Sequence, residues 1–65
     1  MNFTEARFKK KLTQWDIQRL TGISQSKISL IERGYVSPSE DEKDRIASAL
    51  GFGAREIEWP GPGQS

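Results

Sequence analysis

The chain has 65 residues, enough for one domain, and 34% of them are hydrophobic. It contains no cysteine and no histidine, which excludes disulfide bonds and thiolate metal sites and removes the commonest general base. No apolar run approaches the roughly 20 residues that cross a bilayer, and the N-terminus lacks the apolar segment of a signal peptide. We therefore expect a cytoplasmic binding protein rather than an enzyme, with no metal, cofactor, membrane partner or small-molecule ligand.

Charge is distributed unevenly along the chain. Residues 1–39 carry seven Lys or Arg against three Asp or Glu, a net charge of +4. Residues 40–65 carry three Lys or Arg against six Asp or Glu, a net charge of −3. The first part suits a polyanion such as nucleic acid, and the second would repel it. A solvated polar surface with no partner explains the same pattern, so charge alone does not decide between the two.

The sequence signals for helix ends divide the chain into short helices. A small chain with few hydrophobic residues favours helices, because their contacts are short-range in the sequence. The expected N-caps are Thr13, Ser24 and Ser39, and the expected terminating glycines are Gly22, Gly34 and Gly51. These signals predict an all-α fold, a compact five-helix bundle with helices at about 3–10, 14–21, 25–33, 40–50 and 54–58.

The acidic residues at the start of the predicted helix 40–50 have a structural explanation. Glu42 stands three residues after Ser39, where a capping box places an acid. Negative charge in the first turn is also stabilised by the helix dipole. The alternating ligands and central glycine of a calcium loop are missing, so we do not expect a metal site.

The segment from Thr13 to Gly34 carries the functional signal. Two short predicted helices flank a turn that contains Gly22 and the isolated apolar residue Ile23. The isoleucines along this segment have spacings that let the two helices cross and share a core. That arrangement is the geometry of a helix-turn-helix, whose second helix enters the major groove of DNA.

Over residues 3–59, which include this segment, the chain resembles the lambda-repressor-like family of helix-turn-helix domains, also called the Cro/C1 or XRE type. The stretches that carry the resemblance are Leu12-Thr13-Gln14, Gly22-Ile23-Ser24-Gln25-Ser26, Ile28-Ser29, Ile31-Glu32-Arg33-Gly34, Pro38-Ser39 and Ile46-Ala47-Ser48-Ala49-Leu50-Gly51. The resemblance implies a DNA-binding transcriptional regulator, with a repressor expected from the small size. It also implies double-stranded DNA as the partner and a dimer on a two-fold operator. Because the last predicted helix is short and its apolar residues can be used in the core, we expect a weak homodimer that forms mainly on DNA.

The resemblance implies roles for individual residues. The base-contacting residues would be Gln25, Ser26, Ser29 and Leu30. The phosphate-contacting residues would be Gln14, Ser24, Lys27, Arg33, Tyr35 and Ser37. Arg7 and Glu32 would form a structural pair between the first and third helices. A glutamine such as Gln25 can pair bidentately with adenine, which is worth about 1–3 kcal/mol of discrimination.

Several residues depart from the family pattern. Gln18 stands where a small alanine usually packs the second helix against the third, so we expect a wider crossing or a Gln18 that bends outward. Lys11 occupies a turn position that is often Gly or Asn, which predicts backbone strain. Leu30 replaces a polar or basic residue on the outward face of the third helix and could contact a thymine methyl or a protein.

The same features allow a second function. Trp15, Leu20 and Leu30 point away from the predicted core and could form the contact surface of a protein-interaction module, such as the antitoxin partner of a toxin. Residues 60–65 are rich in Pro and Gly, and we expect them to be disordered, either as a natural end or as a cut linker. The sequence does not indicate the operator or the regulated genes.

Overall fold

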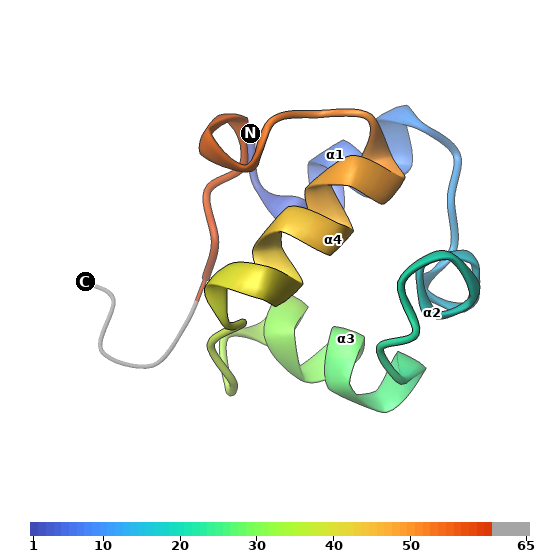
Figure 1. The fold of residues 1–65 in the computed structure, drawn as a ribbon, viewed down its shortest axis with the longest axis vertical. Helices are drawn as coiled ribbons and strands as arrows, with labels where there is room; N and C mark the ends of the chain where they lie inside the picture. The colour runs from blue at the N-terminus through green and yellow to red at the C-terminus, as the bar shows by residue number, and fades with distance from the viewer. Residues whose placement is uncertain (61–65) are drawn as a thin grey trace.

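The computed structural model describes residues 1–60 of the chain. Its elements are α1 (Phe3–Lys9), α2 (Gln14–Thr21), α3 (Gln25–Arg33), α4 (Glu40–Leu50) and the 3₁₀ turn η1 (Ala54–Glu56) (Figure 1). The all-α prediction is confirmed, and α2, α3 and α4 have the predicted bounds. The predicted disordered tail, 60–65, lies outside the described residues except for Pro60.

The helix ends follow from side chains and glycines that are local in the sequence. Each of the three predicted N-caps accepts a hydrogen bond from the backbone N–H three residues later, which satisfies one of the N–H groups that a helix start leaves free. Ser39 and Glu42 form the predicted capping box. At the other ends, Gly22, Gly34 and Gly51 adopt a left-handed conformation with φ of 80–82°, which glycine takes without a steric penalty.

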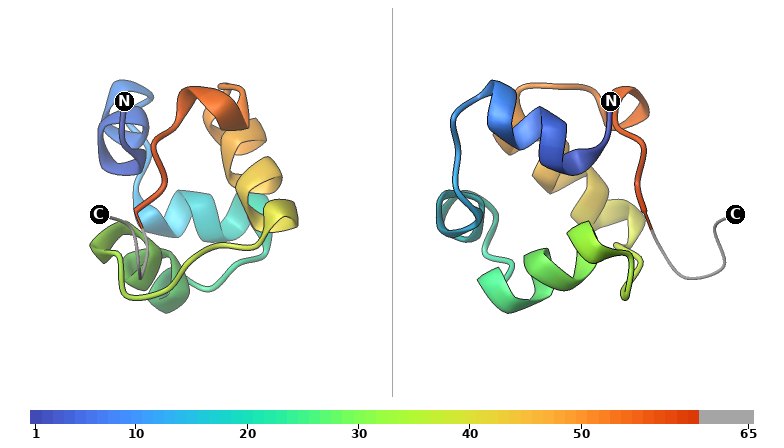
Figure 2. Two further views of the ribbon diagram at one scale, coloured as in Figure 1. Left: turned by 90° about the vertical axis from the view of Figure 1, so that its left-hand side faces the viewer. Right: turned by 180° about the vertical axis from the view of Figure 1, so that it is seen from behind.

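The core lies between the four α-helices. The largest fully buried side chains are Phe3, Ile17, Ile28, Ile31, Ile46 and Leu50. In Figure 1, α3 runs along the lower edge of the molecule and α2 is seen nearly end-on beside it. The view from behind places α1 in front of α4 and keeps α3 at the lower edge, away from the N-terminus (Figure 2). This packing leaves one long side of α3 on the surface of the molecule.

The fifth predicted helix, about 54–58, is not confirmed over its predicted length. Only Ala54–Glu56 form a helical turn, of the 3₁₀ type, and Ile57 is extended with φ −105° and ψ 128°. The Glu58 N–H donates to the Met1 carbonyl oxygen at 2.8 Å, and Asn2 and Glu58 form an isolated parallel β-bridge. A five-residue helix has little stability of its own, so pairing with the N-terminal segment prevails. The Trp59 ring then packs edge-on against Phe3, with ring centroids 5.8 Å apart.

The turn between α1 and α2 contains the strain that the sequence predicts. Lys11 has a φ of 58°, and it is the only residue other than glycine with a positive φ in the described part of the chain. This conformation costs a side-chain-bearing residue about 1–2 kcal/mol. The turn allows the Leu12 N–H to donate back to the Arg7 carbonyl oxygen at 3.1 Å, so the path of the chain into α2 is fixed.

Candidate nucleic-acid interface

Three residues connect α2 to α3. Gly22 turns the chain, Ile23 is buried as the sequence predicts, and Ser24 caps α3. The Thr21 hydroxyl donates to the Ile17 carbonyl oxygen at 2.6 Å and accepts from the Ile23 N–H at 3.1 Å. Because this buried hydroxyl uses both its donor and an acceptor position, the turn is held from inside the molecule.

The outward side of α3 carries four of the predicted DNA-contacting residues. Successive helical residues are about 100° apart, so the buried Ile28 and Ile31 define the inner side of α3. The opposite side carries Ser26, Ser29, Leu30 and Arg33. Ser26 and Arg33 are exposed, Ser29 is half-buried, and Leu30 is 38% exposed. These side chains present hydroxyl groups, an apolar surface and a cation in one stripe.

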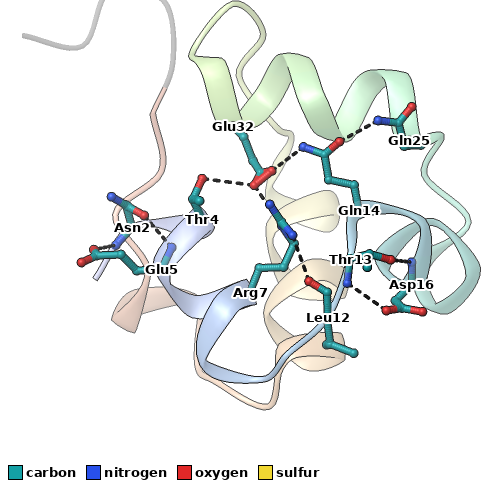
Figure 3. A network of polar contacts seen from close by, with 10 residues as sticks. All are labelled: Asn2, Thr4, Glu5, Arg7, Leu12, Thr13, Gln14, Asp16, Gln25 and Glu32. Atoms are coloured by element: carbon teal, nitrogen blue, oxygen red, sulfur yellow. Dashed lines mark hydrogen bonds and ion pairs between the residues drawn. The ribbon is translucent and has the colours of Figure 1, made fainter.

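Glu32 joins three helices through one carboxylate (Figure 3). Its Oε1 accepts from the Thr4 hydroxyl at 3.1 Å and from Arg7 Nε at 3.0 Å, and its Oε2 accepts from Gln14 Nε2 at 2.6 Å. The side chains of Arg7 and Glu32 are 13% and 6% exposed, so this ion pair is largely removed from water. Arg7 Nη1 also donates to the Leu12 carbonyl oxygen at 2.9 Å, which ties the network to the strained turn.

The network continues from Glu32 through Gln14 to Gln25. Gln14 Oε1 accepts from Gln25 Nε2 at 2.6 Å. A carboxylate can only accept, so Gln14 must turn its NH₂ group toward Glu32 and its oxygen toward Gln25. Gln25 then gives one N–H to Gln14 and keeps its Oε1 and its second Nε2 hydrogen for another partner. An acceptor and a donor on one amide are the pair that adenine requires in the major groove.

Gln18 fixes the backbone of the same glutamine. Gln18 Oε1 accepts from the Gln25 backbone N–H at 2.7 Å, and Gln18 is half-buried. The side chain therefore bridges α2 and α3 and is not turned out to solvent. Among the described residues, Ser26 has the only backbone N–H in the first turn of α3 with no acceptor, whereas Gln14 and Trp15 both have such free N–H groups at the start of α2.

Five of the six predicted phosphate-contacting residues lie in or next to α3, and the sixth, Gln14, begins α2. The Ser24 hydroxyl accepts from the Lys27 N–H at 3.2 Å and keeps its own hydrogen to donate. Lys27 Nζ lies 2.7 Å from Glu42 Oε2, so this cation is shared with α4. Arg33 has no ion pair within residues 1–60. Beyond the end of α3, the loop exposes the remaining two residues, Tyr35 and Ser37.

Two carboxylates have perturbed acidity. The hydrogen bond from Lys27 and the backbone N–H of Ser39 lower the pKa of Glu42. The backbone N–H and hydroxyl of Thr13 lower the pKa of Asp16, with a smaller contribution from Arg19. Both carboxylates complete capping boxes, so their charge stabilises helix starts. In residues 1–60, no group of three or more acidic side chains lies close enough together to hold a metal ion.

Sequence reasoning missed three parts of this site. It did not connect Gln14 with Gln25, did not include Thr4 in the network, and did not find the bond from Gln18 to the backbone of Gln25. The departure of Gln18 from the small residue usual at its position was a usable signal. A long amide next to the start of another helix suggests a partner there.

Two short helices joined by a three-residue turn around the buried Ile23, with the second helix exposed along one side, define a helix-turn-helix. The family model of the helix-turn-helix domain matches residues 3–59. The chain therefore belongs to this family of helix-turn-helix domains, a class that binds DNA. Comparison with curated proteins gave no match, and comparison with solved structures gave none either. No helix within residues 1–60 is both long and apolar enough to span a membrane.

Proposed function

We propose that this protein is a sequence-specific transcriptional regulator of the Cro/C1 type, acting in the cytoplasm as a repressor. It would insert α3 into the major groove of double-stranded DNA and block transcription by occupying its operator. The observation that carries this proposal is the exposed side of α3, next to a glutamine whose amide is fixed in orientation by Gln14 and Glu32. A fixed amide loses little conformational entropy when it binds a base.

The base contacts we propose are made by the first two turns of α3. Gln25 would pair with adenine through its free Oε1 and its second Nε2 hydrogen. The hydroxyl groups of Ser26 and Ser29 can donate or accept and so add contacts of lower specificity. Leu30 would contact a thymine methyl, which is the apolar group of the major groove.

The phosphate contacts we propose flank these base contacts. At the start of α2, the free N–H groups of Gln14 and Trp15 would bind one phosphate oxygen, since helix starts attract anions. The Ser24 hydroxyl, Arg33, Tyr35 and Ser37 would contact the backbone around α3. Lys27 would share its charge between Glu42 and a phosphate. These contacts position the helix without depending on sequence.

The remaining parts of the proposal concern assembly. A Cro/C1-type regulator works as a dimer on a two-fold site, with recognition helices about 34 Å apart. The stretches that resemble this type lie in or next to α2, α3 and α4 and support the assignment. We propose a weak homodimer that forms mainly on DNA.

Selection of bound sites from a random pool of DNA duplexes tests the proposal directly. We expect a preferred half-site, repeated in two-fold symmetry, and an affinity that falls by orders of magnitude between low and physiological salt. Gln25→Ala should relax the preference at one base pair, whereas Lys27→Ala should weaken binding to all sequences about equally.

Two exposed arginines provide a matched control. Arg33→Ala should weaken binding, whereas Arg55→Ala should leave it unchanged, because η1 lies at the end of the molecule away from α3 (Figure 1). Failure to enrich any sequence, or binding that does not depend on salt, would contradict the proposal. Binding to a protein partner through Trp15, Leu20 and Leu30, with no effect of DNA, would favour the interaction module instead.

A further inference from the structure

We infer that Gln18 is a specificity-determining positioning residue, which holds the backbone of Gln25 so that its side chain meets one base pair in one geometry. The inference rests on the proposed function, because it concerns how that function discriminates between sequences. Its basis is the 2.7 Å hydrogen bond from the Gln25 N–H to Gln18 Oε1, which joins the middle of α2 to the first residue of α3.

The bond replaces a contact that a helix start normally makes with solvent or an anion. The first N–H groups of a helix have no partner within the helix. The Lys27 N–H is capped by Ser24, and Gln18 takes the Gln25 N–H, so within residues 1–60 the first turn of α3 keeps only the Ser26 N–H free. The first turn of α3 is therefore held mainly by the protein, and a phosphate is better received at the start of α2.

Gln14 and Gln18 together hold Gln25 at two points. They are four residues apart on α2 and so lie on the same side of that helix. Gln14 holds the side chain of Gln25 through its amide, and Gln18 holds the backbone. A rotation or shift of the start of α3 would lengthen both hydrogen bonds at once. With Gln18 removed, the side-chain bond alone would allow the backbone of Gln25 to move while the amide stays in place.

The contact itself can be tested without DNA. We expect Gln18→Met, which keeps the length of the side chain and removes the acceptor, to speed amide hydrogen exchange at Gln25 at least ten-fold. Gln18→Glu keeps an acceptor oxygen and should restore the protection. Arg19→Met is the matched control on α2, since within residues 1–60 Arg19 pairs with Asp16 alone and its side chain is 73% exposed. Unchanged exchange at Gln25 in Gln18→Met would overturn the contact.

The role in specificity is tested on the site obtained by selection. The measured quantity is the ratio of affinities for that site and for the same site with the base pair opposite Gln25 exchanged. We expect Gln18→Met to lower this ratio at least three-fold and to leave the affinity for random duplex DNA within two-fold of the wild type. Gln18→Glu should restore the ratio. Gln18→Ala provides a second variant if Gln18→Met does not fold.

The possible failures are distinguishable. If Gln25→Ala lowers the ratio and neither Gln18→Met nor Gln18→Ala does, the inference is wrong and the proposed function stands. If Gln18→Met weakens binding to all sequences equally, Gln18 has only a structural role and the inference is also wrong. If the wild type shows no preference between sequences, the proposed function itself fails.

Discussion

The carboxylate of Glu32 accepts hydrogen bonds but cannot donate them, and this difference fixes the orientation of two amides. Gln14 and Gln25 each have an oxygen and an NH₂ group that could exchange places by a half-turn of the side chain. With Glu32 at one end, only one order of donors and acceptors satisfies both hydrogen bonds, from Gln14 to Glu32 and from Gln25 to Gln14. A single buried charge thereby determines which polar groups Gln25 presents at the surface.

Glu32→Gln should loosen this control. A glutamine at position 32 can offer either an oxygen or an NH₂ group to Gln14, so both amides become free to reverse. We expect discrimination at the base pair opposite Gln25 to fall by about 1 kcal/mol or more, within the range of a bidentate contact. Competition between the selected site and its single-base variant measures this loss.

Thr4→Val is the control for that substitution. It removes one hydrogen bond to Glu32 Oε1 but leaves the charge facing Gln14. We expect lower stability with base discrimination unchanged. Equal discrimination in the wild type and in Glu32→Gln would show that the amides are oriented by something other than the carboxylate.

Lys11 is a second residue whose effect is local. Its left-handed backbone costs about 1–2 kcal/mol, and a glycine at this position would remove that cost. The greater conformational entropy of glycine in the unfolded chain would cancel about 0.5–1 kcal/mol of the improvement. Lys11→Gly should therefore raise the free energy of unfolding by about 0.5–1 kcal/mol, measured by urea denaturation. Lys9→Gly removes the same charge from within α1 and should lower stability instead. A stability loss in Lys11→Gly would refute the strain.

At the scale of elements, α3 is fastened to α4 by the Lys27–Glu42 ion pair. Because the folded pKa of Glu42 is lowered from its ordinary value of 4.5, ionised Glu42 favours the folded state. This contribution is present above about pH 4.5 and is lost as the pH falls through the lowered pKa of the folded state. We expect the melting temperature of Glu42→Gln to fall less than that of the wild type between pH 6 and pH 3.

Lys27→Met separates the two causes of the lowered pKa of Glu42, which are the Lys27 cation and the Ser39 N–H. It removes the cation and leaves the Ser39 N–H bonded to Glu42, so the pKa of Glu42 should rise part of the way toward its ordinary value. NMR titration of the Glu42 carboxyl group measures the pKa directly. An unchanged pKa in Lys27→Met would assign the whole shift to the helix cap.

The elements also divide into those that the sequence predicts and those that it does not. The starts and ends of α2, α3 and α4 depend on Thr13, Ser24, Ser39 and the glycines, all within a few residues of the helices that they limit, so their effects can be inferred locally. The residues on the outward side of α3 can also be inferred locally, because the helical period places them opposite Ile28 and Ile31. The contacts of Gln18 and Gln14 with Gln25 depend on how two helices cross, which no local pattern specifies.

At the scale of the whole molecule, the C-terminal segment closes over α1. The pairing of Glu58 with Met1 joins residues 57 positions apart. Local sequence signals do not indicate a contact at that separation, so they favoured a helix where Ile57 is extended. Trp59 completes the closure by packing against Phe3 and by donating from Nε1 to the Ala54 carbonyl oxygen at 3.1 Å.

The two tryptophans allow this closure to be tested. Trp59→Ala should lower the free energy of unfolding by about 2 kcal/mol, less than the roughly 3–5 kcal/mol of a fully buried tryptophan because Trp59 is half-buried. Trp15→Ala, at a side chain that is 64% exposed, should change stability by less than about 0.5 kcal/mol. Urea denaturation followed by circular dichroism compares the two. Equal losses would show that the closing segment does not contribute to the core.

The hydrogen bond from Glu58 to Met1 brings residues near the two ends of the chain together. The order of the helices along the sequence could therefore be changed while their arrangement in space is kept. With these two residues side by side, a short linker from Pro60 to Met1 could make the chain circular. The loop after α3, which is exposed at Tyr35 and Ser37, could then be opened to give new termini. The permuted protein would run from α4 through η1, α1 and α2 to α3. In that protein α3 would be synthesised last, after the other elements.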